Sequence, residues 1–104
     1  SKAATHIAQM NLDDTREKIH LQVAQNQFKV KEAQKKLNMA MKNIASAEEN
    51  LRCANLGFKE GVMEVTDVMA AQTAWQQAQS QKIDAEIDVK LTQVGLNKAL
   101  GILQ

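Results

Sequence analysis

The chain has no proline and no tyrosine, and its 104 residues include only four glycines, two phenylalanines, one tryptophan and one cysteine. So few bulky core residues and turn formers argue against a compact globule of this length. The single Cys53 excludes an internal disulfide. What the chain has in abundance is alanine, glutamine, lysine, glutamate and leucine, all good helix formers. This composition favours long helices or a coiled coil.

The formal net charge is +1, so the charge balance does not indicate a strongly charged partner. The one basic concentration, Lys29 to Lys36, is typical of a solvated helix face, and nucleic-acid binding would need a stronger basic patch. No apolar run approaches the roughly 18 residues of a membrane span, and the chain does not start with a signal peptide. We expect any export signal or membrane contact of the protein to lie in parts outside this chain.

Each half of the chain carries an apolar stripe whose steps alternate between three and four residues. That spacing keeps one narrow face of a helix turned toward a partner helix. We call the two stripes together the seam. In the first half, the seam consists of Ile19, Val23, Asn26, Val30, Ala33, Leu37, Ala40, Ile44, Ala47, Leu51 and Ala54. In the second half, it consists of Val68, Ala71, Trp75, Ala78, Lys82, Ala85, Val89, Thr92, Leu96, Ala99 and Leu103.

The segment between the two stripes predicts a tight turn. Gly61 suits the residue after the first helix, where glycine adopts the left-handed conformation without steric cost. Thr66 is the expected N-cap of the second helix, and Asp67 then lies in its first turn, where the helix dipole favours an acid. We expect one domain over residues 1–104, with helices at about 3–60 and 66–103 and a tip turn at about 61–65.

The two stripes fit each other when the chain is folded about Gly61. Residues equally far from Gly61 then meet, so that Ala47 faces Trp75 and Leu37 faces Ala85. Large residues face small ones at nearly every level, as close packing requires. The predicted fold class is therefore all-α, a long antiparallel two-helix coiled-coil hairpin that turns near Gly61.

Two features indicate further helical neighbours. Residues before about position 18 lack a partner within the chain, because Leu103 pairs with Ile19. The second helix also carries an apolar stripe on the face opposite the seam, made of Ile83, Ile87, Leu91 and Val94. A helix that is apolar on two opposed faces should lie between two neighbours, which implies a wall or ring of helices.

Nothing in the sequence favours catalysis, and we expect no cofactor. Glu17 and His20 have the Glu-x-x-His spacing of di-iron bundles, but such a site needs a second copy, and His6 does not supply one. Cys53 lies off the seam without a nearby histidine. The tip is more informative, since Val62 and Met63 place apolar atoms at the end of a hairpin. These side chains suit local capping and docking to a partner equally well.

The stretch from Leu56 to Gln72 resembles the periplasmic turn of the TolC family of outer-membrane efflux proteins. The family's turn has an aromatic residue, a Gly-[Leu/Val] pair, a hydroxyl or valine, and then Asp-Val-Leu-x-Ala-Gln. The corresponding residues here are Phe58, Gly61, Val62, Thr66, Asp67, Val68, Met69, Ala71 and Gln72. The segment from Leu96 to Gly101 is similar to the one that closes each repeat of the family.

This resemblance implies a trimeric channel whose helices form a tunnel across the periplasm, with this chain as one hairpin fragment of it. It implies docking of the tip to a periplasmic adaptor protein, and through it to an inner-membrane pump, by Gly61, Val62, Met63 and Thr66. It implies a pore constriction at Asp67. It also implies a location in the periplasmic portion of an outer-membrane protein of a Gram-negative bacterium.

The chain departs from the family's pattern at three positions, and two other functions remain open. Phe58 replaces a common tyrosine, Met63 stands where some members have a basic residue, and Ala70 stands where some have a second acid. The first alternative is the helical hairpin of an adaptor, whose tip resembles Arg-x-x-x-Leu-x-x-x-x-x-x-Ser. Arg52 and Leu56 match this pattern, but Met63 replaces the serine. The second alternative is a free-standing structural coiled coil.

Overall fold

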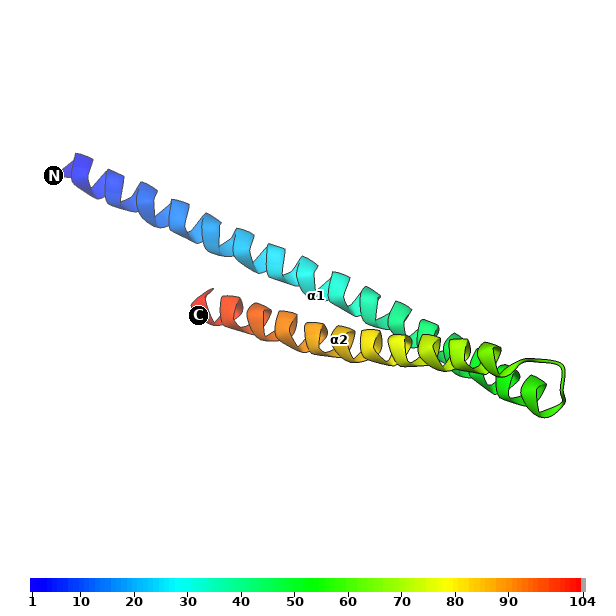
Figure 1. Cartoon of the computed structure of the whole chain (residues 1–104). Helices are drawn as coiled ribbons and strands as arrows, with labels where there is room; N and C mark the ends of the chain where they lie inside the picture. The colour runs from blue at the N-terminus through cyan, green and yellow to red at the C-terminus, as the bar shows by residue number, and fades with distance from the viewer. Residues whose placement is uncertain (104) are drawn as a thin grey trace. The chain divides into compact units, whose positions relative to one another are not determined.

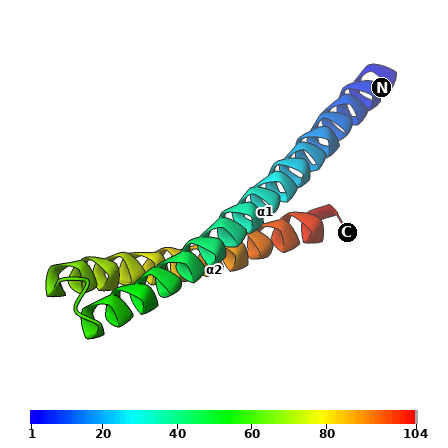
Figure 2. The ribbon, with the colours of Figure 1, turned by 90° about the vertical axis from the view of Figure 1, so that its right-hand side faces the viewer.

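The computed structural model describes residues 1–103, which fold into two helices without a β-strand. Helix α1 spans Lys2–Lys59 and helix α2 spans Val65–Leu103 (Figure 1). The turn joins the end of α1 to the start of α2 (Figure 2). The predicted fold class is confirmed: an all-α, antiparallel two-helix coiled coil that turns at Gly61. Both helix boundaries at the turn lie one residue earlier than expected.

The chain divides into two compact units. Residues 33–89 form the tip unit, which contains the turn and the helical segments next to it. Residues 1–32 and the segment that begins at Lys90 form the terminal unit. Ala33 and Val89, which are expected to face each other across the seam, both belong to the tip unit, whereas the next expected pair, Val30 and Thr92, belongs to the terminal unit. Every expected seam pair therefore belongs to a single unit.

The core of the tip unit lies on the seam in the predicted register. Ile44, Ala47 and Ala78 form one buried cluster, and Trp75 packs against it. The cluster and Trp75 together contain both members of two predicted pairs, Ala47 with Trp75 and Ile44 with Ala78. The buried apolar residues of this unit all belong to the seam: Ala33, Ala40, Ile44, Ala47, Ala54, Val68 and Ala78. A large side chain opposite alanine lets the helices approach closely without a void.

In the terminal unit, Val23 and Ala99, which the predicted register pairs with each other, are both buried. The polar seam residue Asn26 is accommodated because Gly95 has no side chain. A β-carbon on Gly95 would lie 3.1 Å from Asn26 Oδ1. The amide nitrogen of the same side chain donates a 2.7 Å hydrogen bond to the carbonyl of Gln22 one turn earlier. Leu103, the last seam residue, is exposed at the end of α2.

The second apolar stripe of α2 is solvent-exposed in both units. Ile83 and Ile87 are 47% and 50% exposed in the tip unit. Leu91 and Val94 are exposed in the terminal unit. These side chains lie off the seam, as the heptad spacing predicts, so α1 does not cover them. They leave apolar surface available to another helix.

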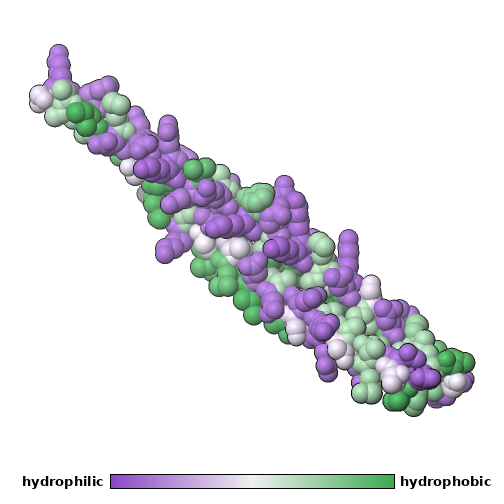
Figure 3. All heavy atoms as spheres, turned by 45° about the horizontal axis from the view of Figure 1, so that its top comes forward, coloured by the Kyte–Doolittle hydropathy of each residue, from purple (hydrophilic) through white to green (hydrophobic). Residues whose placement is uncertain are grey.

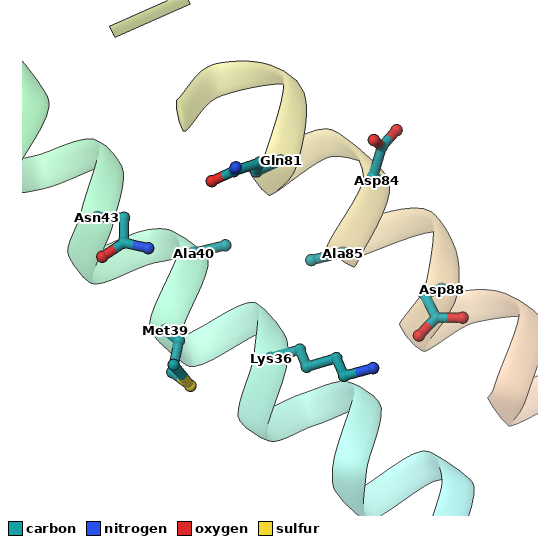
Figure 4. A pocket seen from close by; sticks show the side chains of 8 residues that line it. All are labelled: Lys36, Met39, Ala40, Asn43, Gln81, Asp84, Ala85 and Asp88. Carbon is teal, nitrogen blue, oxygen red and sulfur yellow. The ribbon is translucent and has the colours of Figure 1, made fainter. Parts of the chain in front are cut away.

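At one position along the tip unit, the side chains of the seam do not fill the space between the two helices. Ala40 and Ala85 point toward each other across an open groove of about 540 Å³ (Figure 4). Lys82, the seam residue expected to face Ala40, has its amine 3.7 Å from Glu86 Oε1 on the same helix. Its methylenes remain half-buried along the seam while its charge reaches water, as predicted.

These differences between levels predict opposite responses to one substitution. Ala47→Leu should overpack against Trp75 and lower the free energy of unfolding by about 1–3 kcal/mol. Ala40→Leu places the same added atoms in front of the groove, opposite Lys82 rather than a large apolar side chain, and should be neutral or stabilising by about 1 kcal/mol. Urea unfolding, followed by circular dichroism at equal protein concentration, compares the two variants. Equal destabilisation by both would show that the register or the groove is wrong.

Candidate docking tip

Helix α1 ends in a Schellman motif. The amide of Val62 donates a 2.8 Å hydrogen bond to the carbonyl of Gly57, and the amide of Gly61 donates a 3.1 Å bond to the carbonyl of Phe58. These two bonds occupy carbonyls that the helix end would otherwise leave without an intrahelical partner. The motif requires a left-handed residue after the helix, and Gly61 supplies it with a φ of 78°. The prediction that Gly61 is the left-handed residue after the first helix is confirmed.

A residue that replaced Gly61 would be strained by the backbone conformation and not by contacts of its side chain. A β-carbon at this position would meet nothing within 4 Å inside the chain. An L-residue would still have to adopt the left-handed conformation, which costs roughly 1–2 kcal/mol. The space in front of Gly61 therefore remains free for a partner, and a bulky side chain placed there would point into that space.

Met63 and Val62 have different environments although they are adjacent. The Met63 side chain lies against the backbone of Gly57, where an added β-carbon would be 2.7 Å from Met63 Cγ and 2.9 Å from Sδ. The amide of Met63 also donates to the Gly57 carbonyl at 3.0 Å. Met63 is 41% exposed, whereas Val62 is 79% exposed, more than any other large apolar side chain in residues 1–103.

Helix α2 starts at Val65, so the prediction that Thr66 is its N-cap is wrong. Glu64 holds that position, because its carbonyl accepts the amides of Asp67 and Val68 at 3.0 and 3.4 Å. Asp67 Oδ2 accepts a 3.0 Å hydrogen bond from the Glu64 amide, which is the reaching-back half of a capping box. The carboxylate three residues into the helix thus fixed its start. Thr66 instead directs its hydroxyl to Glu64 Oε2 at 3.5 Å.

Exposed apolar side chains surround the turn on both helix ends. Green atoms lie at the turn end of the molecule in Figure 3, among white and purple ones. The large apolar residues exposed there are Leu56, Phe58, Val62, Met63, Val65 and Met69. We call them the tip surface. Exposed apolar side chains gathered at one end of a hairpin are typical of a contact with another protein.

Over residues 1–102, the chain matches the model of the family described as outer membrane efflux protein. The chain belongs to the outer membrane efflux protein family. The resemblance to TolC-type proteins is thereby confirmed, and the chain is part of an outer-membrane efflux channel of a Gram-negative bacterium. Neither the curated proteins nor the solved structures include a match to this chain. No helix within residues 1–103 is long and apolar enough to cross a membrane.

In this efflux-family hairpin, the predicted docking residues lie close together in the sequence at the tip. Gly61, Val62 and Met63 form the loop itself, and Thr66 lies in the first turn of α2. Asp67 lies in that first turn as predicted, with one carboxylate oxygen engaged by the Glu64 amide. The sequence analysis missed Gly57, the residue on which Met63 packs. The available signal was a glycine inside a long helix, where alanine is the more stable choice.

A second feature that sequence reasoning missed is an ion pair on α1, about two to three helical turns before the helix ends at Lys59. Arg52 Nη2 lies 2.6 Å from Glu49 Oε1, and this hydrogen-bonded partner lowers the pKa of Glu49. Cys53 Sγ lies 3.6 Å from the same carboxylate oxygen and is exposed off the seam. All three side chains are on the surface of α1, so the pair adds little to stability.

Proposed function

We propose that this chain is a segment of the periplasmic tunnel wall of a trimeric efflux channel, and that its tip docks to a periplasmic adaptor protein. Through the adaptor, the channel would work with an inner-membrane pump. The observation that carries the docking proposal is the exposure of Val62 at the end of a rigid turn, surrounded by the rest of the tip surface. The membership of the efflux family supplies the class of partner.

The Schellman motif suits the tip for docking because it fixes the loop before any partner arrives. Three backbone hydrogen bonds hold Gly61, Val62 and Met63 to the last turn of α1. A loop that is already ordered loses little conformational entropy on binding. The tip of one hairpin buries a small area, so each contact is weak, and threefold repetition in a trimer would supply avidity.

The exposed stripe on α2 supports the wall proposal. Ile83 and Ile87 in the tip unit leave apolar surface on α2 that α1 does not cover. A free-standing two-helix coiled coil would not need that surface, which argues against this alternative. The adaptor alternative is disfavoured by the family match, because that match is to the channel component itself.

Asp67 is proposed to line the constriction of the closed channel. Three or more copies of a carboxylate around one axis would repel anions and favour cations. The hydrogen bond from the Glu64 amide holds this carboxylate at the start of α2. The ring of acids would thus be built on a capped helix end rather than on a mobile loop.

Photocrosslinking from position 62 tests the docking proposal. A photoreactive phenylalanine analogue replaces Val62 in the intact channel protein, expressed in its own cells, and mass spectrometry identifies the adducts. The matched control carries the analogue at Phe28, an exposed apolar residue of the terminal unit. We expect peptides from the hairpin of the adaptor at position 62 and none at position 28. Adaptor adducts that are absent at 62, or equally abundant at 28, would contradict docking at the tip.

A further inference from the structure

Gly57 is buried, although it lies off the seam and inside α1. The backbone does not require glycine there, because the residue of positive φ within residues 1–103 is Gly61. Glycine in a helix interior is less stable than alanine. Something other than backbone conformation must therefore explain a residue without a side chain at this position.

The space that Gly57 leaves is occupied by Met63. A β-carbon on Gly57 would lie 2.7 Å from Met63 Cγ, 2.9 Å from Sδ and 3.2 Å from Cβ. Contacts under 3.0 Å force one of the two groups to move. The carbonyl of Gly57 also accepts the amides of both Val62 and Met63. Gly57 thus binds the main chain of the loop through its carbonyl and contacts the side chain of Met63.

We call the space that the absent side chain of Gly57 leaves on α1 the notch. We propose that Met63 is a positioning residue: its side chain fills the notch and so holds Val62 outward, in the orientation that contacts the adaptor. This inference rests on the proposed docking of the tip. It assigns different tasks to two adjacent apolar residues, with Val62 contacting the partner and Met63 fixing the loop. Val62 is 79% exposed and Met63 is 41% exposed, as expected if Val62 contacts the partner and Met63 packs against the chain.

The unbranched thioether of methionine suits the task. Methionine adapts its shape to an irregular gap, and here the gap is the surface of a helix backbone. Because Met63 follows Val62 directly, a displaced Met63 would carry the loop amides away from the Gly57 carbonyl. The hydrogen bonds of 2.8 and 3.0 Å that those amides donate would then be lost or lengthened. Loss of the notch should therefore be visible as faster hydrogen exchange at both amides.

The test compares Gly57→Ala, Met63→Ala and the double variant. Gly57→Ala should lower the protection of the Val62 and Met63 amides about tenfold, since an overpacked contact shifts a local equilibrium by roughly a decade. The double variant should recover much of that protection, because the closest remaining approach is the 3.2 Å between two β-carbons. Gly101→Ala is the matched control, since its β-carbon would meet nothing within 4 Å and its helix should only gain stability.

Docking is measured in the intact channel protein by the amount of the adaptor, identified by crosslinking at position 62, that copurifies with it. We expect Gly57→Ala to reduce the retained adaptor and the double variant to restore part of it, whereas Gly101→Ala has no effect. Undiminished amide protection and undiminished adaptor in Gly57→Ala would overturn the notch inference. Val62→Ala separates the two ideas: if it leaves adaptor retention unchanged, the docking proposal fails, while the amide protection still decides whether Met63 fixes the loop.

Discussion

Replacing Gly61 with arginine should abolish adaptor crosslinking at the tip and drug efflux by the intact channel, while leaving the helix content nearly unchanged. Gly61 lies outside both helices, and the space in front of it is free inside the chain. An arginine side chain would fill the space that a docking hairpin needs. Minimal inhibitory concentrations and crosslinking from position 62 measure the two losses, and circular dichroism measures the helix content.

Two smaller substitutions separate steric blocking from backbone strain at Gly61. Asparagine tolerates the left-handed conformation, so Gly61→Asn should keep the turn and most of the docking. Gly61→Ala adds little bulk but imposes a strain of roughly 1–2 kcal/mol on the observed φ of 78°. We expect efflux to fall in the order Asn, Ala, Arg. Normal efflux with undiminished crosslinking in Gly61→Arg would remove the tip from the docking model.

Replacing Asp67 with asparagine should weaken the cation preference of the channel severalfold without reducing adaptor binding. The substitution removes the proposed ring of negative charge but keeps a side-chain oxygen that can accept the Glu64 amide. Reversal potentials of the purified channel in planar bilayers under a salt gradient measure the preference. Because exposed charges are screened by salt, the difference from the wild type should shrink as ionic strength rises.

Asp67→Ala is the informative companion, because it removes the charge and the capping bond together. Loss of such a cap costs about 1 kcal/mol, so this variant should also loosen the start of α2. The asparagine and alanine variants should therefore agree in ion preference and differ in stability. An unchanged reversal potential in Asp67→Asn would exclude Asp67 from the constriction.

The two helices and their register could be read from the sequence because one weak signal is repeated many times. Each heptad step carries little information, but the seam from Ile19 to Ala54 continues without a slip. Every one of these residues is buried or half-buried in the structure. The complementarity of Ala47 and Trp75 then fixed the register, because large and small residues can alternate correctly in few alignments.

The predicted N-cap of α2 was wrong because several neighbouring side chains can each cap the helix. Thr66 has a hydroxyl suited to capping, and the sequence offers no means of ranking it against a carboxylate that reaches back from the next residue. The structure shows Asp67 on the Glu64 amide. Such choices depend on differences of roughly 1 kcal/mol between local hydrogen-bonding patterns.

By itself, the sequence determined the fold class, the seam, the position of the turn at Gly61 and the resemblance to the efflux family. The fold class, the seam and the turn follow from periodicity and from short-range conformational preference, which act along the chain, whereas the resemblance rests on the motif between Leu56 and Gln72. Only the tertiary structure decided that Met63 fills the space at Gly57 while Val62 stays exposed, and that a groove opens between Ala40 and Ala85. The reason is that both features depend on the distance between atoms of separate segments, which composition and spacing leave undetermined.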